Sequence, residues 1–515
     1  MSELGRLARG SAGTTLGGVV TALAAFCSVA IVARSLGPAA AGVFGVCVAL
    51  SAIVTQIGKL GCDTALVHTL PRWSRDAALR SDRERLLVGC LAAVGGLGVV
   101  AGVVAWLAAV PISDAFLNAV PDAAAVDAVR AMALGLPPAA VTAVALAGTR
   151  GLGTVRPLVL NDQVAKPLLR LLGVGLVLAA GGGVVGVLAV WSAVAWLLLP
   201  WALLALTRRL TRAPHGWTRP LDAGQRRSFV RYAVLRCWSA SVEVVGLYAG
   251  LLVVSALLGA AEAGVYAVAL RLVLAGFLTL QAVRLAVAPE LSSALTEASP
   301  RRAERLHQTS SAWVVLTAWP LYLVLVGLAP QVLSVFGPDF VDGAAVLGIL
   351  AIGGLVSVAA GNIQTVLLMG GLAGSYLGVA IASVVAHVAA VATLVPVFGV
   401  EGAAVGFVVA CIVENGLAML IVARRLGVRP VGTPVVAAAL ASAGTIGVGV
   451  VLARLLDPGP AGGTGMLVLV LTVSSLAYLA VCWRLRAALA LDAALARLHP
   501  RRPEPAVRDL AKETT

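Results

Sequence analysis

The chain has 515 residues, of which 60% are hydrophobic and only 12% are charged, and its formal net charge is +14. A soluble globular domain carries about 25% charged residues, so this composition excludes an ordinary soluble protein and indicates a membrane protein. The arginines lie mainly in short connections between apolar stretches, without an array of aromatic residues. We therefore read the positive charge as membrane topology and expect no nucleic-acid partner.

About fourteen apolar stretches follow one another along the chain, and each is long enough for a bilayer crossing of about 20 residues. They begin near Thr14, Ala39, Leu86, Val129, Pro157, Val184, Val234, Gly264, Ser311, Ala344, Ser375, Gly402, Val435 and Met466. Pro137-Pro138 interrupts the fourth stretch, and the fifth carries charges. The sequence predicts an all-α polytopic membrane protein with about 14 transmembrane helices.

The charges of the connections alternate along the chain. Even-numbered connections carry basic groups such as Arg72, Arg150, Arg156, Arg208, Arg209, Arg226, Arg227, Arg301, Arg302, Arg424 and Arg425. Odd-numbered connections carry few cations and several acids, including Asp114, Asp122, Asp339, Asp342 and Glu401. Because cytoplasmic loops are enriched in Lys and Arg, this pattern predicts that both termini are cytoplasmic.

One sequence segment occurs twice, 222 residues apart: LGPAAAGVFGV at residues 36–46 and LGAAEAGVYAV at residues 258–268. A weaker echo links residues 183–186 with residues 402–406. Both repeats preserve the number of intervening helices, so we predict two six-helix lobes in pseudo-symmetric repeat plus two C-terminal helices. The predicted units are an N-lobe (1–206), a basic cytoplasmic linker (207–231), a C-lobe (232–425), helices thirteen and fourteen (426–486) and a cytoplasmic tail (487–515).

Several short segments carry a family resemblance. They are residues 33–38 with 42–44, 61–67, 263–271, 288–291, 336–340 and 399–404. With this architecture, the chain resembles the multidrug/oligosaccharidyl-lipid/polysaccharide exporter superfamily, which is MATE-like, and most of all its bacterial polysaccharide flippases. The resemblance implies a flippase in the bacterial cytoplasmic membrane that moves an undecaprenyl-pyrophosphate-linked saccharide by alternating access. It implies membrane lipids, the lipid-linked saccharide and polymer-assembly membrane proteins as partners.

Ionisable residues inside the apolar stretches are the candidate site residues, because a charge at the bilayer centre costs about 2.5–3.5 kcal/mol on insertion scales. The candidates for substrate binding are Arg236, Arg271, Arg284, Lys59, Lys166 and Arg170. Arginine forks can replace the hydration of a pyrophosphate with charge-assisted hydrogen bonds. The candidates for ion coupling are Glu243, Asp162 and Glu414.

Structural roles for the same residues stay open. Asp162 and Lys166, spaced i and i+4 with Arg170 at i+8, can form an internal ion pair. Arg170, Lys59 and Arg284 can extend to the membrane interface from helix ends. His387 is more typical of a packed polar residue than of a proton relay.

Cofactor chemistry has little support in the sequence. Seven cysteines are scattered without a CxxC or Cys/His cluster, which predicts neither a metal site nor a disulfide framework. No GxxxxGK[ST] segment indicates ATP hydrolysis. We therefore expect no cofactor, with proton or sodium coupling left open.

Three other functions compete with the polysaccharide flippase. A cation-coupled multidrug exporter of the same fold would favour a cavity rich in acids and aromatics, whereas the intramembrane charges here are mainly basic. A peptidoglycan-precursor flippase would also need a cationic cavity, so the residues do not separate it. A polytopic glycosyltransferase usually carries acids in a long first outer loop, but here residues 37–40 form a short turn without an acid. We expect that the protein is not an enzyme.

Overall fold

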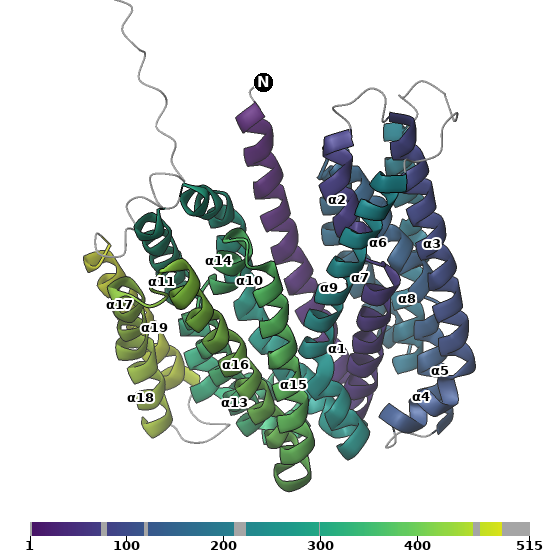
Figure 1. The fold of residues 1–515 in the computed structure, drawn as a ribbon. Coiled ribbons are helices and arrows are strands. Elements are labelled where there is room, and N and C mark those ends of the chain that lie inside the picture. Colours follow the sequence, from purple (N-terminus) through teal and green to yellow (C-terminus); the bar gives the residue numbers. More distant parts are fainter. Residues whose placement is uncertain are drawn as a thin grey trace, which may run out of the picture.

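The structure is a computed structural model, and it describes residues 3–73, 80–117, 122–210, 223–297, 299–456 and 464–486. Throughout these ranges the secondary structure is helical, and the helices run side by side as one bundle (Figure 1). Eleven of the described helical segments are long and apolar enough to cross a membrane, and Val468–Arg484 is a shorter apolar helix. The predicted all-α polytopic fold is confirmed.

The described part of the N-terminal half contains nine helical elements. They are α1 (Glu3–Gly58), α2 (Cys62–Trp73), α3 (Arg80–Leu107), α4 (Ala109–Phe116), α5 (Asp122–Ala133), α6 (Leu136–Gly151), the π-helix η2 (Leu158–Ala165), α7 (Lys166–Ala179) and α8 (Val184–Leu210).

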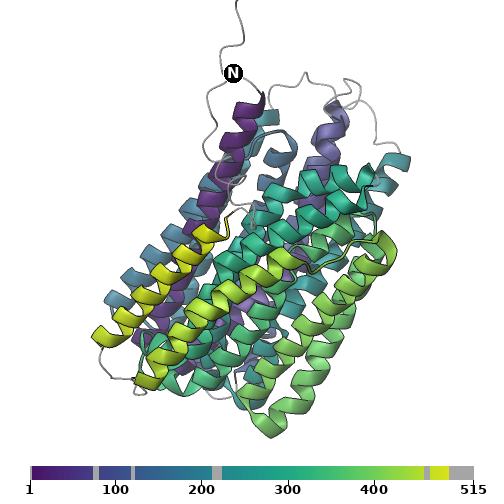
Figure 2. The same ribbon diagram turned by 90° about the vertical axis from the view of Figure 1, so that its left-hand side faces the viewer.

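The C-terminal half is also helical throughout its described residues, and further helices follow at its C-terminal end. Its elements are α9 (Ala223–Leu258), α10 (Ala260–Thr296), α11 (Pro300–Gly327), α12 (Ala329–Ser334), the 3-10 helix η3 (Pro338–Gly343), α13 (Ala344–Ala359), α14 (Ile363–Met369), α15 (Ala373–Phe398), α16 (Val400–Leu426), α17 (Thr433–Ser442), the π-helix η4 (Ala443–Gly447), α18 (Val448–Leu456) and α19 (Thr464–Arg484). The C-terminal helices α17–α19 pack outside α11, where the yellow segments lie in front in Figure 2.

All fourteen predicted apolar stretches are helical, but they are grouped differently from the prediction. The first two form the single element α1, which bends at Gly37, and the fifth is split between η2 and α7. The fourth is interrupted just before its proline pair, because α5 ends at Ala133 and the prolines begin α6. Proline fits the first turn of a helix, where its missing N–H costs no hydrogen bond.

The predicted linker 207–231 differs from the structure at both of its described ends. Helix α8 continues to Leu210, and α9 already begins at Ala223. Residues 211–222 and the predicted tail 487–515 lie outside the described residues. The lobe boundaries therefore stay a prediction.

The repeated sequence segment is a structural repeat. Gly37 in the first copy has φ 79° and ψ −178°, and Gly259 in the second has φ 95° and ψ −179°. Glycine adopts this left-handed backbone without the penalty that a Cβ imposes. In both copies the chain turns at the glycine and immediately starts a helix, so the two halves reverse direction in the same way.

The two copies also pack directly against each other. A Cβ built on Gly42 would lie 1.7 Å from the Ala260 carbonyl oxygen, and one built on Gly264 would lie 2.0 Å from the Pro38 carbonyl oxygen. Side chains are therefore excluded on both sides, and α1 and α10 meet backbone to backbone, as small residues allow in membrane proteins. This contact joins the two halves on the side of the bundle that lies opposite the N-terminus of α1 (Figure 1).

Candidate functional site

The depth of each charged residue can be counted along its helix. Arg271 lies 11 residues after the start of α10, or about 16 Å at 1.5 Å per residue, and Glu243 lies 15 residues before the end of α9, or about 22 Å. A bilayer core is about 30 Å thick, so Arg271 lies near its middle and Glu243 lies about three-quarters of the way across it. Arg236 and Arg284 lie about 33 and 36 Å from the same ends, beside the opposite boundary.

Arg271 lies where the two halves of the molecule meet. Its side chain lines a small cavity of about 30 Å³ with Phe44 of α1 and Tyr248 of α9. The guanidinium forms no ion pair with any described residue. Arg271 is thus a mid-membrane cation in the seam between α1, α9 and α10, without a counter-charge of its own.

The C-terminal half encloses a polar cavity of about 340 Å³ between α9, α10, α15 and α16. Three of the predicted residues, Glu243, Arg284 and Glu414, line this cavity. The Tyr376 hydroxyl donates a 2.5 Å hydrogen bond to Glu243, and Gln364 Nε2 donates a 2.8 Å bond to Glu414. Two carboxylates at similar depth therefore face one space, and each is held by a neutral donor.

Neutral polar side chains complete this cavity, and the sequence interpretation missed all but one of them. His387 Nδ1 lies 3.1 Å from the Gly246 carbonyl oxygen, while its Nε2 is buried without a partner in the described part of the chain. Both amide atoms of Asn362 are likewise buried and unpartnered there. Asn362, Gln364 and Asn415 stand out in the sequence as amides inside apolar stretches, which is the signal that would have found them.

Charges in the N-terminal half form a separate cluster around the π-helix η2. Lys166 Nζ lies 2.8 Å from Asp162 Oδ1, so the internal ion pair that the spacing allowed is present. The Arg170 guanidinium lies 3.9 Å from the Trp191 ring centre, and its Nη2 donates a 3.3 Å bond to the Trp191 carbonyl oxygen. The positive charges of Arg170 and Lys59 also act on Asp162.

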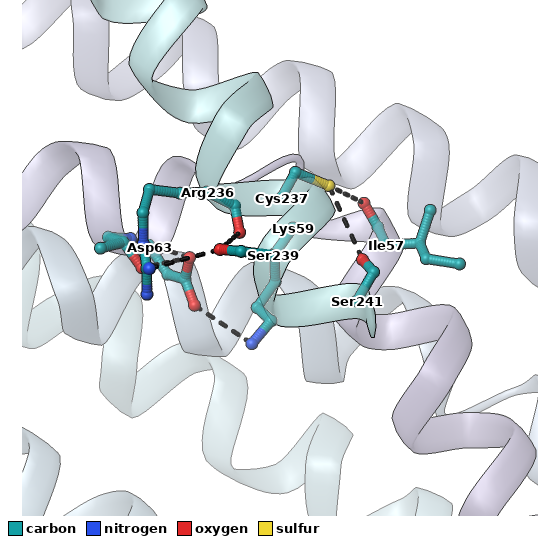
Figure 3. Close-up of polar contacts among 8 residues, drawn as sticks. Ile57, Lys59, Asp63, Arg236, Cys237, Ser239 and Ser241 are labelled. Atoms are coloured by element: carbon teal, nitrogen blue, oxygen red, sulfur yellow. Dashed lines mark hydrogen bonds and ion pairs between the residues drawn. The ribbon is translucent and has the colours of Figure 1, made fainter. Parts of the chain in front are cut away.

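Lys59 lies in a break of the second predicted helix, not late within it. Helix α1 ends at Gly58, and Leu60 and Gly61 both have positive φ, 53° and 69°. The turn brings Lys59 Nζ to 3.1 Å from Asp63 at the start of α2 (Figure 3). Lys59 therefore has a local counter-charge, which the sequence interpretation did not assign.

Arg236 lies across from this break on α9. Its Nη1 donates a 3.3 Å hydrogen bond to the Ser239 hydroxyl (Figure 3). Its Nε is buried with no partner among the described residues, and none of them forms an ion pair with this guanidinium. Arg236 and Arg271 thus share one property: both are cations on central helices without an ion pair among the described residues.

The candidate residues therefore form three groups and not a single ring. Lys59, Asp162, Lys166 and Arg170 belong to the charge-compensated cluster of the N-terminal half. Glu243, Arg284 and Glu414 line the cavity of the C-terminal half. Arg236 and Arg271 lie on the helices between them.

The chain belongs to the family described as polysaccharide biosynthesis protein, whose pattern it matches over residues 7–295, more than half of its length. This match confirms the predicted resemblance. A search of curated protein sequences finds no match.

Solved structures of transporters share the fold. A lipid II flippase MurJ in an inward closed conformation aligns with a TM-score of 0.72 at 11% identity, covering 93% of this chain and 99% of that one. An inward-facing multidrug resistance MATE family transporter of the MOP superfamily aligns with a TM-score of 0.65 at 18% identity, covering 79% and 94%. A MOP superfamily transporter from Pyrococcus furiosus gives 0.57 at 18% identity, covering 82% and 95%. The protein is thus a multi-pass membrane protein with a transporter fold.

Proposed function

We propose that the protein is a flippase that moves a lipid-linked saccharide of the undecaprenyl-pyrophosphate type across the bacterial cytoplasmic membrane. The observation that carries this proposal is Arg271, a cation near the middle of the membrane without an ion pair among the described residues. Arg236, which is likewise without an ion pair there, lies on the neighbouring helix beside the boundary. An intramembrane charge normally faces a partner or a wet cavity. A substrate phosphate supplies the missing negative charge.

Chemistry favours arginine for this task. A guanidinium is always charged, is weakly hydrated and presents paired donors that match phosphate oxygens. A pyrophosphate loses its hydration when it leaves the membrane surface, and fork-like hydrogen bonds compensate for this loss. Arg271 in the seam then contacts the headgroup midway, while Arg236 contacts it nearer the cytoplasmic boundary.

The other cations take supporting roles. Lys59, Lys166 and Arg170 already have protein partners at 2.8–3.9 Å, so their charges are largely compensated. They hold the shape of the N-terminal half and add positive potential beside the substrate path. Arg284 lines the C-terminal cavity together with Glu243 and Glu414, where we assign it the role of balancing their charge.

The C-terminal cavity is the proposed site of ion coupling. Glu243 and Glu414 face one space with neutral donors on each, an arrangement that can exchange a proton or hold a sodium ion. Binding there would bias the rocking of one half against the other, because α9 and α10 belong both to this cavity and to the seam. No other cofactor is proposed.

The topology completes the proposal. We place both termini in the cytoplasm on the alternation of basic and acidic connections. Membrane lipids surround the apolar helices, and polymer-assembly membrane proteins would receive the product. The protein acts as a transporter in this scheme and makes or breaks no covalent bond.

Purified protein in liposomes tests the proposal. A fluorescent undecaprenyl-pyrophosphate saccharide is incorporated in both leaflets, and a membrane-impermeant quencher reports its transfer. We expect transfer by the wild type, at least a tenfold lower rate for Arg271→Gln, and a wild-type rate for Arg301→Gln, an exposed arginine at the start of α11. Efflux of cationic drugs without saccharide transfer would instead favour the multidrug exporter.

A further inference from the structure

A third cavity, which is lined by cations, lies between the C-terminal end of α2 and the N-terminal end of α9, on the side of the N-terminus of α1 (Figure 1). It has a volume of about 320 Å³, and its polar lining includes Arg72, His68 and Thr69 from α2 and Arg231, Tyr232 and Ser228 from α9. None of the described residues that line it is acidic. None of the roles proposed above uses this cavity.

Two aromatic rings form a wall of the cavity and join its two helices. The His68 imidazole stacks on the Tyr232 phenol with ring centres 4.3 Å apart and planes at 13°. About two turns from His68, just before α2 begins, a Cβ on Gly61 would lie 2.0 Å from the Ala233 carbonyl oxygen, so the backbone at the start of α2 touches α9. The cavity is therefore a defined space between two fixed helices.

The two arginines that line the cavity are exposed and have no ion pair among the described residues. Arg72 comes from the N-terminal half of the chain and Arg231 from the C-terminal half, yet both face the same cavity. The charge of Arg72 also acts on the His68 ring. An anion held between the two arginines would gain two charge-assisted contacts in place of their hydration by water. Hydroxyl donors on Thr69 and Ser228 suit the remaining oxygens of such an anion.

We propose that this cavity binds a phosphate-bearing anion, and that the anion holds the cytoplasmic ends of α2 and α9 together. The group is a phosphate or pyrophosphate, carried by a membrane lipid headgroup or free in the cytosol. Bound anion would stabilise the conformation in which these helix ends touch. The proposal rests on the cavity and does not depend on which substrate the protein transports.

Calorimetric titration of inorganic pyrophosphate into the purified full-length protein, freed of phospholipid in detergent, tests the site. We expect saturable binding by the wild type and about tenfold weaker binding for Arg72→Gln and for Arg231→Gln, since each removes one charge-assisted contact. The matched control is Arg227→Gln, an exposed arginine on the same helix that does not line the cavity. Thermal unfolding of each variant without ligand checks that it is folded.

The same titration in nanodiscs distinguishes the two sources of the anion, a lipid headgroup and a free phosphate compound. If a lipid headgroup fills the site, phosphatidylglycerol nanodiscs weaken the apparent pyrophosphate affinity, whereas phosphatidylcholine nanodiscs do not. Equal affinity in both nanodiscs indicates a free phosphate compound. Either result supports the site.

Two results would overturn the proposal. One is the absence of saturable pyrophosphate binding by folded wild-type protein. The other is equal weakening by Arg227→Gln and by the two lining variants, which would mean general attraction to a basic surface. His68→Ala gives a further test, because loss of the stacked wall is expected to weaken binding while the net charge stays unchanged.

Discussion

At the scale of single residues, the carboxylates of the two halves have different partners. In the N-terminal half, Asp162 is surrounded by the positive charges of Lys166, Arg170 and Lys59. In the C-terminal half, Glu243 and Glu414 are held by neutral donors. The first arrangement is fixed by charge compensation, whereas the second leaves carboxylates available for an incoming ion.

Removing the central carboxylate of the N-terminal cluster should destabilise the fold. In Asp162→Asn, Lys166 and Arg170 lose their nearby counter-charge while Lys59 keeps Asp63, and we expect a loss of about 1–2 kcal/mol in the free energy of unfolding, because the pair is only partly exposed. Chemical denaturation in detergent measures it. The surface variant Asp127→Asn, which breaks the 3.3 Å contact with Arg130, should cost less than about 1 kcal/mol. Equal losses would mean that the cluster is not a structural unit.

Neutralising the coupling carboxylate should separate transport from the ion gradient. We expect Glu243→Gln to fold normally and to transport at a rate that an imposed proton or sodium gradient does not change. Tyr376→Phe, which removes the 2.5 Å hydrogen bond, should reduce the gradient effect several-fold. The control is Glu297→Gln in the exposed pair with Arg302. Full gradient dependence in Glu243→Gln would rule out this residue as a coupling site.

At the scale of the elements, the repeated segment explains how the halves are joined. Gly37 and Gly259 give both copies the same turn, and Gly42 and Gly264 let the following helices touch. Because no side chain lies between the two backbones, the helices are either in contact or separated, with no intermediate packing. A contact with only two states is suited to a gate that opens and closes between the two halves.

A methyl group at this contact should therefore have a large effect. In Gly42→Ala the new Cβ meets the backbone of Ala260, which cannot rotate away as a side chain would. We expect α1 and α10 to separate, with transport reduced at least tenfold. Gly18→Ala on the same helix, where a Cβ meets nothing within 4 Å, should behave like the wild type. Transport assays and cross-linking of cysteines placed on α1 and α10 measure both effects, and equal behaviour of the two variants would contradict the contact.

At the scale of the whole molecule, hydropathy and the repeat were enough to predict the helical architecture. A stretch of about 20 apolar residues has few alternatives to a membrane helix, and two copies of one segment imply two similar units. The local breaks were harder to predict. The turn at Lys59 and the π-helix around Asp162 depend on tertiary packing, which hydropathy does not report.

For the candidate site, the sequence predicted which types of residue are involved but not how they are arranged. Charges inside apolar stretches were recognised, but helix spacing alone does not show which of them meet. Arg236 and Glu243 share a face of α9 by spacing, yet Glu243 lines the C-terminal cavity with Tyr376 while Arg236 bonds Ser239. The partner Tyr376 lies 133 residues from Glu243, so a single sequence does not connect the two, whereas Asp63 is only four residues from Lys59 and was within reach of the same spacing argument.

The central claim is that an uncompensated arginine in the seam binds an anionic, lipid-linked substrate. The most direct measurement compares cells that carry the wild type, Arg271→Gln or the control Arg301→Gln, at equal membrane levels. Lipid-linked saccharide in the inner leaflet and polymer at the cell surface are quantified in each. The account predicts accumulation inside and at least a tenfold loss of surface polymer for Arg271→Gln alone. Normal polymer in Arg271→Gln would contradict it.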